Sequence, residues 1–180
     1  YSMKKIFIVS AALLLLDCGE KKAKLETVTV SADSSQEEVY LGSEREAQFE
    51  NKQVAQVYDD YNLLKVALVN TDAEAAKAAA SKMLESIKEL DSDTAELLVT
   101  AQDIAAATDV AIQRARFEEL TAEVKSLVEA NITSGSLYYQ YCPMAFNGKG
   151  AYWISNEEKV YNPYFGDVML NCGTVDSKIE

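Results

Sequence analysis

The sequence predicts an all-α fold: an up-and-down four-helix bundle with a small, irregular, cysteine-containing subdomain at its C-terminal end. Three observations support this prediction. Apolar residues in the middle of the chain recur every three or four positions, residues typical of helix starts separate these stretches, and glycine and aromatic residues become frequent after Ser134-Gly135. A length of 180 residues allows one domain with a substantial core.

Residues 1–18 have the pattern of a secretory leader. Two lysines at positions 4 and 5 precede an apolar run from Ile6 to Leu16, which is too short to span a bilayer as a permanent helix. Cys18 then resembles the lipidated cysteine of a bacterial lipobox, although Asp17 stands where a small residue is usual; the alternative is ordinary secretion. We therefore expect an exported protein, anchored by lipid in the cell envelope and facing the periplasm or the cell surface.

Residues 19–46 are polar and mixed in charge, and they follow neither a helical nor a strand period. This composition is typical of a tether. We expect the helical bundle to occupy residues 47–133 and the C-terminal subdomain to occupy residues 134–180.

The expected bundle has four apolar stripes, each of which places its members on one face of a helix. The first two stripes are Val54, Val57, Tyr58, Tyr61, Leu64 and Leu68, and then Ala76, Ala79, Met83, Ile87 and Leu90. The last two are Leu97, Ala101 and Ile104, and then Val110, Phe117, Leu120, Val124 and Leu127.

Capping signals separate these helices. Thr71 with Glu74 has the spacing of a capping box, Asp91-Ser92-Asp93 precedes Glu96, and Thr108-Asp109 opens the fourth helix. Arg114 lies near the apolar stripe of that helix, where its side chain either extends to water or binds a carbonyl or carboxylate of the C-terminal segment.

Charge and composition exclude several classes of function. Seventeen basic and 29 acidic residues give a net charge of −12, which disfavours nucleic-acid binding. The chain has no histidine, which excludes Ser-His-Asp and Cys-His catalysis and the Glu-x-x-His signature of di-metal bundles. Since the sequence also has no phosphate-binding loop and no cofactor fingerprint, we do not expect an enzyme.

Specific chemistry is expected in the C-terminal segment, where the composition changes sharply. Residues 135–173 contain both prolines of the chain, five of its seven glycines and nine of its 16 aromatic residues. The glycines and the Asn162-Pro163 dipeptide indicate turns. Here we expect short strands or loops laid against the end of the bundle.

The same segment contains four sulfur side chains in two pairs. Cys142 and Met144 are two residues apart, so in an extended segment they point to one side. Met169 and Cys172 are three apart, so in a helical turn they share a face. Two thiolates and two thioethers favour a soft ion, Cu(I) or Ag(I).

The alternative for Cys142 and Cys172 is a disulfide. An exported chain meets oxidising conditions, and an even pair of cysteines remains if Cys18 is lipidated or removed. Met144 and Met169 are then ordinary core filler. Both interpretations of the cysteine pair stay open on the sequence alone.

Three segments together resemble a known family. They are QRARFEEL (residues 113–120), CPMAFNGKGAYWIS (142–155) and YNPYFGDVMLNCG (161–173), which follow a lipoprotein leader. In this combination the chain resembles uncharacterised Gram-negative lipoproteins classed as a domain of unknown function, over most of its length from the first helix onward. Versions of that domain are attached to periplasmic adaptor subunits of copper and silver efflux pumps.

The resemblance implies a periplasmic, non-enzymatic role near metal handling, with a metal-efflux adaptor or another envelope protein as the partner. The Cys142-Pro143-Met144 element looks like that of short heavy-metal-binding modules, which usually continue with histidine; here Ala145 follows. The predicted function is binding of Cu(I) or Ag(I) through Cys142, Met144, Met169 and Cys172. The alternative is a structural or protein-interaction module closed by a Cys142–Cys172 disulfide, without metal.

Overall fold

The computed structural model describes residues 39–90 and 94–180, which belong to one compact unit. The expected leader, the expected lipidation at Cys18, most of the expected tether and the helix-start signal at 91–93 lie outside the described residues.

Four long helices occur where the apolar stripes predict them: α1 (Lys52–Val69), α2 (Ala73–Lys88), α3 (Ala95–Ala106) and α4 (Val110–Glu129). Side chains of Asn51, Asp72 and Asp109 cap three of them by accepting backbone N–H groups. The predicted cap of the second helix at Thr71 is wrong by one residue. Thr71 instead has a positive φ of 57° in the turn before Asp72.

The prediction of an all-α fold is wrong, because the chain also forms two small antiparallel sheets. One pairs β1 (Gln48–Phe49) with β2 (Ile132–Ser134). The other has the order β4-β3-β5 and contains β3 (Leu137–Cys142), β4 (Ala151–Ser155) and β5 (Thr174–Ile179). The expected irregular subdomain is therefore a regular sheet with a long loop, and the fold is mixed α/β.

Sequence composition explains why this sheet forms. β3 is rich in tyrosine and β4 contains tyrosine, tryptophan and isoleucine, all of which favour strands. A tight connection joins the two strands through α5 (Ala145–Gly148), a single turn in which Phe146 and Asn147 have positive φ angles of 50° and 59°. The hairpin aligns Cys142 with Ala151 and Gln140 with Trp153.

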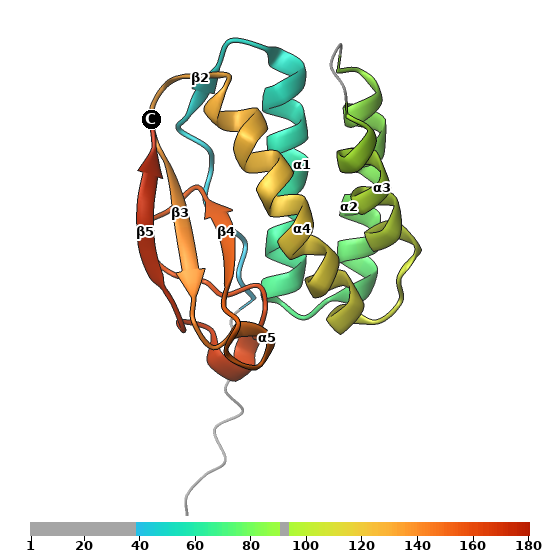
Figure 1. The fold of residues 1–180 in the computed structure, drawn as a ribbon, viewed down its shortest axis with the longest axis vertical. Helices are drawn as coiled ribbons and strands as arrows, with labels where there is room; N and C mark the ends of the chain where they lie inside the picture. Colours follow the sequence, from blue (N-terminus) through green and yellow to red (C-terminus); the bar gives the residue numbers. More distant parts are fainter. Residues whose placement is uncertain (1–38, 91–93) are drawn as a thin grey trace, which may run out of the picture. The chain divides into compact units, whose positions relative to one another are not determined.

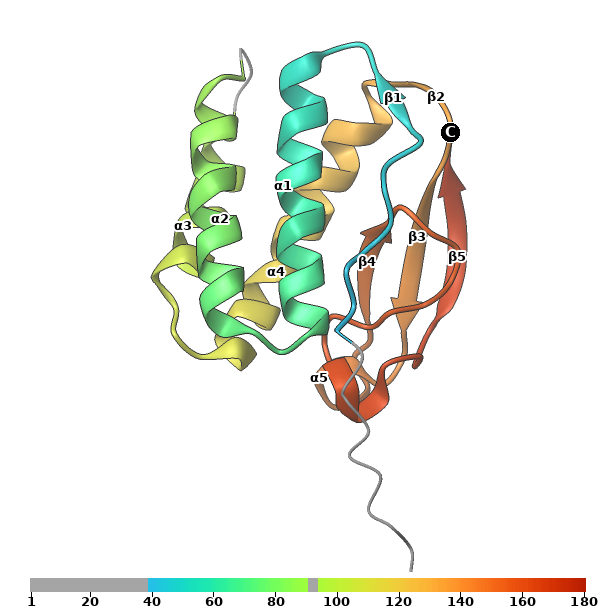
Figure 2. The same cartoon turned by 180° about the vertical axis from the view of Figure 1, so that it is seen from behind.

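Figures 1 and 2 show the sheet beside α1 and α4, with α2 and α3 on the far side of these two helices. One core runs through both parts. Its aromatic section passes from Tyr61 to Phe117 (5.0 Å between ring centroids), on to Tyr164 (6.0 Å) and then to Trp153 (6.0 Å). The cysteine-bearing segments are thus packed onto the bundle through aromatic side chains.

Residues 39–46, the described part of the expected tether, form a strap that runs along α1 and β4 to β1 (Figure 2). The backbone N–H of Tyr40 donates a hydrogen bond to Oδ1 of Asn70 at the end of α1, and Nδ2 of Asn70 donates one to the Tyr40 carbonyl. Arg45 makes an ion pair with Asp59, and the Ser43 carbonyl accepts a bond from Asn156. This part of the chain therefore has a defined place on the folded unit.

Among the helices of the described residues, none combines the length and the apolar character needed to cross a membrane.

Candidate functional site

The two C-terminal cysteines meet in the folded chain. Cys142 is the last residue of β3 and is fully buried, whereas Cys172 lies in the loop after the 3-10 helix η1 (Gly166–Met169) and is partly exposed. Their Sγ atoms are 3.1 Å apart although the residues are 30 positions apart in sequence. Both are free thiols.

Asn162 holds the loop that carries Cys172. Its side chain is fully buried, and its Nδ2 donates to the Cys172 carbonyl at 2.6 Å. Its Oδ1 accepts from the backbone N–H of Tyr164 at 2.7 Å, and its own N–H donates to the Leu170 carbonyl at 2.7 Å. The sequence predicts a turn at Asn162-Pro163, and this dipeptide is the signal from which the role of Asn162 could have been found.

The sulfur–sulfur distance lies between two chemical arrangements. A disulfide requires about 2.05 Å. Two sulfurs that bind one tetrahedral metal ion, each at about 2.3 Å, lie about 3.8 Å apart. From 3.1 Å, either arrangement needs a displacement of about 1 Å or less, judged by these reference lengths.

The pKa of the Cys172 thiol is raised, first by its hydrogen bond with Cys142 and then by burial. A thiol with a raised pKa is mostly protonated near neutral pH and is a slow nucleophile. Metal binding to this pair must therefore release thiol protons, which makes the affinity depend on pH.

The two methionines are placed less favourably than the cysteines. β3 ends at Cys142, so the strand alternation that would align Met144 with it does not continue to Met144, whose surface is 54% exposed. Met169 is partly buried, and its carbonyl accepts the N–H of Cys172 at 3.1 Å, which is the helical-turn spacing that the sequence predicts.

In the described part of the chain, no three His, Cys, Asp or Glu side chains converge in a way that could hold a metal ion. The thiol pair is therefore a two-sulfur donor set with a methionine close in sequence to each cysteine. Such a set suits soft thiophilic ions better than ions that take four or more nitrogen and oxygen ligands.

Trp153 and Gln140 lie on the same sheet face as Cys142, and sequence reasoning assigned neither to the site. Both are fully buried cross-strand partners. Gln140 donates from Nε2 to the carbonyls of Glu157 and Glu158, which fastens the loop over this face. Trp153 Nε1 and Gln140 Oε1 have no hydrogen-bond partner among the described residues, and each unsatisfied atom costs about 1–3 kcal/mol.

A second polar cluster holds the strap in place. The fully buried Lys65 donates to Tyr40 Oη at 2.9 Å and to Ser155 Oγ at 3.0 Å, and it lies 3.8 Å from the Glu157 carboxylate. Burial lowers the pKa of Lys65 to about 8, although Glu157 acts in the opposite direction. These groups satisfy one another's hydrogen bonds and charges, so the cluster serves to hold the strap against α1 and β4.

The sequence left two alternatives for Arg114, extension to water or binding to the C-terminal segment, and the structure shows the second. Its Nε donates to the Pro163 carbonyl at 2.7 Å, and Nη2 donates to the carbonyl of Leu68 and to Thr71 Oγ1, both at 3.0 Å. Arg114 therefore joins α4, the end of α1 and the loop that leads to Cys172.

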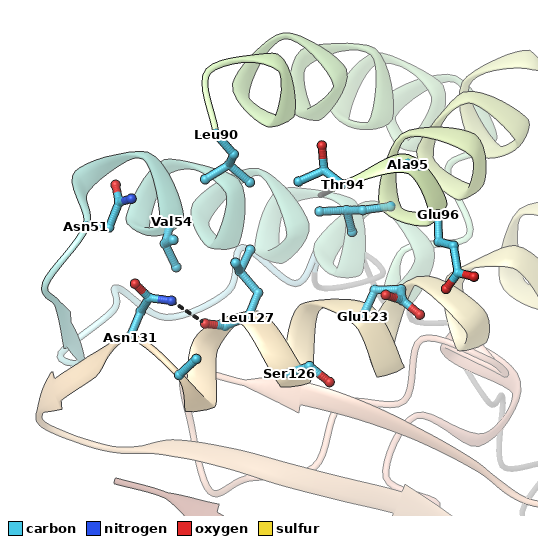
Figure 3. Close-up of a pocket in the computed structure, with 12 residues that line it drawn as sticks. Asn51, Val54, Leu90, Thr94, Ala95, Glu96, Glu123, Ser126, Leu127 and Asn131 are labelled. Atoms are coloured by element: carbon cyan, nitrogen blue, oxygen red, sulfur yellow. Dashed lines mark hydrogen bonds between the residues drawn. The ribbon is translucent and has the colours of Figure 1, made fainter. Parts of the chain in front are cut away.

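A cavity of about 800 Å³ lies between the helices (Figure 3). Val54, Leu90 and Leu127 contribute apolar surface to it, and Glu96 and Glu123 lie on one side. Burial and the neighbouring Glu96 carboxylate raise the pKa of Glu123. Neither cysteine lines this cavity, so it is separate from the sulfur site.

The helical part of the chain matches a known family model. A family model described as "Protein of unknown function (DUF3347)" matches residues 57–135. No curated protein and no solved structure matches the chain. The matched span runs from α1 to the turn after β2 and stops before Cys142. The helical part of the chain is therefore similar to an uncharacterised domain.

Proposed function

We propose that the chain is a soft-metal-binding protein of the bacterial cell envelope, in which the thiols of Cys142 and Cys172 bind Cu(I) or Ag(I). The approach of the two Sγ atoms to 3.1 Å is the observation that carries this proposal. The sulfur-only donor pair favours a soft ion. The envelope location, the lipid anchor at Cys18, the absence of enzymatic activity and a metal-efflux adaptor as the partner rest on the sequence pattern and the resemblance.

In this proposal each residue has a defined task. Cys142 supplies a buried sulfur fixed at the end of β3, and Cys172 supplies a partly exposed sulfur through which the site is reached. Asn162 and Arg114 hold the loop so that the second sulfur stays beside the first. Met169, adjacent to Cys172 in the same turn, is the better placed of the two thioethers, because Met144 is more exposed.

The second candidate is a module for protein interaction in which Cys142 and Cys172 form a disulfide. The burial of Cys142 favours it, because a bridge with one buried sulfur is shielded from reductants on that side and stabilises a loop-rich segment. In this case the chain binds no metal, and the cysteines only hold the loop against the sheet.

Native mass spectrometry of the full chain with Cys18→Ser separates the two candidates, since this variant keeps only two of the three cysteines. The protein is isolated under oxidising conditions, reduced, and then exposed to Cu(I) without oxygen. We expect one bound Cu(I) that is lost when Cys142→Ser is added. A chain that is two hydrogens lighter on isolation and binds no Cu(I) after reduction contradicts the metal proposal and supports the disulfide.

The methionines are tested in the same experiment. Met169→Leu should weaken Cu(I) binding more than Met144→Leu, because Met144 is the more exposed side chain. Met83→Leu is the matched control, since Met83 is fully buried in the bundle core. Equal affinity in all three variants would remove the thioethers from the site and leave the two thiols.

A further inference from the structure

The sheet face that carries Cys142 is dominated by one large side chain. Directly opposed residues of paired strands project to the same face. Gln140 is opposite Trp153 and Cys142 is opposite Ala151, so these four side chains share a face. All four are buried, and Trp153 is much the largest of them.

The indole of Trp153 crosses the strand that carries Cys142. Its backbone lies on β4, on one side of β3, whereas Gly173 leads into β5 on the other side (Figure 1). A Cβ atom on Gly173 would lie 2.9 Å from Cη2 of Trp153 and 2.8 Å from the Tyr141 carbonyl oxygen. The indole thus reaches from beside Cys142 to the residue that follows Cys172.

Packing accounts for a large aromatic side chain at this position, where Trp153 lies against Tyr164, but not for an indole in particular. Its Nε1 is buried and has no hydrogen-bond partner within the described residues. Buried indole N–H groups usually have a partner, and phenylalanine would fill much of the same space without leaving a donor unsatisfied. Besides its larger volume, tryptophan has the most electron-rich ring face of the aromatic side chains, which attracts cations more strongly than the rings of tyrosine or phenylalanine.

We propose that Trp153 forms an aromatic wall of the sulfur site and favours a soft monovalent cation there over Zn(II). This inference rests on the proposed binding of metal by Cys142 and Cys172. A structural zinc site takes four ligands, and no third Cys, His, Asp or Glu joins the thiols within the described residues. The indole face adds cation–π attraction and excludes water, which suits an ion that is satisfied by few sulfur ligands.

Trp153 is also the only tryptophan of the chain, so its fluorescence reports on this site alone. The reduced full chain with Cys18→Ser is titrated with Cu(I) in the absence of oxygen, and separately with Ag(I) and Zn(II). Bound metal is counted by native mass spectrometry in parallel. We expect one equivalent of Cu(I) or Ag(I) to quench the emission, whereas Zn(II) binds more weakly and changes it less.

Two substitutions test the wall. Trp153→Leu removes the ring and should weaken Cu(I) binding about 3- to 30-fold, which is the range expected for a cation–π contact. Trp153→Phe keeps a weaker ring and should lose less. Phe117→Leu is the matched control, because Phe117 is an equally buried aromatic residue of the bundle core. It should leave the Cu(I) affinity unchanged.

The outcomes separate this inference from the proposed function. Stoichiometric Cu(I) binding that leaves the Trp153 emission unchanged would contradict the role of Trp153 in the site. An unaltered Cu(I) affinity in Trp153→Leu would contradict it too. Both results would leave the proposed thiol site intact. Absence of Cu(I) binding in the reduced chain overturns the proposed function as well. The fluorescence titration needs no substitution at Trp153, so it decides the matter even if both Trp153 variants fail to fold.

Discussion

The helical bundle and the C-terminal sheet share one core but use different chemistry. Fully buried positions of α1 to α4 are filled largely by aliphatic residues such as Leu64, Leu68 and Ile104. Buried positions of the sheet face hold Cys142, Gln140 and Trp153. Unsatisfied buried polar atoms do not separate the two regions, because among the described residues Asn62 and Gln113 of the helices have one each, as do Gln140 and Trp153 of the sheet. The regions differ instead in the thiol pair, which lies at the end of β3.

The two regions also differ in the range of the contacts that build them. The bundle is defined by residues three and four apart and by short turns between neighbouring helices. The thiol pair joins residues 30 apart, and Lys65 in the bundle bonds Ser155, which is 90 residues away. Local periodicity therefore determines the first region, and long-range packing determines the second. Four experiments test this contrast.

Truncation of the aromatic core is expected to have the largest effect. Phe117→Ala in the bundle and Trp153→Ala in the sheet should each lower the free energy of unfolding by about 3–5 kcal/mol, because both side chains are fully buried. Since the core is continuous, each variant should unfold in one transition. Urea denaturation followed by far-UV and near-UV circular dichroism measures this, and separate transitions for the two signals would contradict a shared core.

Ile112→Ala is the control for these truncations. Ile112 lies on α4 with 55% of its surface exposed, so its loss should change the free energy of unfolding by less than about 0.5 kcal/mol.

Oxidation of Cys142 and Cys172 to a disulfide should stabilise the C-terminal sheet region. A bridge between residues 30 apart is expected to raise the free energy of unfolding by about 3–4 kcal/mol through loop-closure entropy. Urea denaturation of the Cys18→Ser chain with and without reductant measures the difference. The same chain with Cys142→Ser should show no effect of reductant, and a difference that persists there would have another origin.

The hydrogen bonds of the buried Lys65 join the bundle to the sheet, and its lowered pKa predicts that the free energy of unfolding depends on pH in the alkaline range. The pKa of Lys65 is lowered by burial to about 8 in the folded chain, from 10.5 in its unperturbed state. Between these values the unfolded chain binds more protons, so the free energy of unfolding rises with pH, by at most about 1.4 kcal/mol per unit from this group. Lys65→Met should lack this rise between pH 8 and 10.

The pH range used to test Lys65 must end near pH 10, because above it buried tyrosines lower the free energy of unfolding as the pH rises. Burial raises the pKa of Tyr139 to about 12, so the stability that its neutral form contributes is lost as the pH rises beyond the unperturbed value of 10.0. Lys88→Met, which removes a largely exposed lysine, should keep the wild-type pH dependence. A variant at Lys65 that behaves like Lys88→Met would show that the buried lysine is not responsible.

The smallest expected effect concerns the hairpin that precedes Trp153. Gly150 has a φ of +79°, and a Cβ there would lie 2.0 Å from Tyr141 Oη. Gly148 has a φ of +88° and open space around it. Gly148→Ala should therefore cost only the backbone term of about 1 kcal/mol, and Gly150→Ala about 2 kcal/mol. Thermal denaturation ranks them. Tyr141→Ala removes the ring whose Oη, Cζ and Cε2 lie within 2.6 Å of the new Cβ, so the added cost of Gly150→Ala should be smaller in that background.

Sequence reasoning located the helices because each one depends on its own residues. The stripes of Val57, Leu64 and Leu68 and the cap at Asp109 are local signals, and the helices follow them closely. The predicted cap at Thr71 failed because Asp72, one residue later, offers a carboxylate that accepts the N–H of Ala75. Such one-residue shifts are set by the geometry of the turn.

The sequence predicts short strands or loops after Ser134-Gly135, but it does not show that residues 137–142 and 151–155 pair in one regular sheet. These strands are stable only as partners, joined by a turn in which Phe146 and Asn147 adopt the left-handed region. Both sequence-based alternatives, the metal site and the disulfide, bring Cys142 and Cys172 together, whereas the sequence does not predict the participation of Trp153, Asn162 and Lys65. Their roles depend on residues far away in the chain.

The sequence alone determined the positions of four helices, the charge that disfavours nucleic acids, and the segment that contains Cys142 and Cys172. Periodicity and composition are enough for these, since they depend on neighbouring residues. Only the tertiary structure decided that the segment is a sheet, that the two thiols lie 3.1 Å apart and that the indole of Trp153 reaches Gly173, the residue after Cys172. Strand pairing and loop closure bring distant residues together, and no local pattern specifies that pairing.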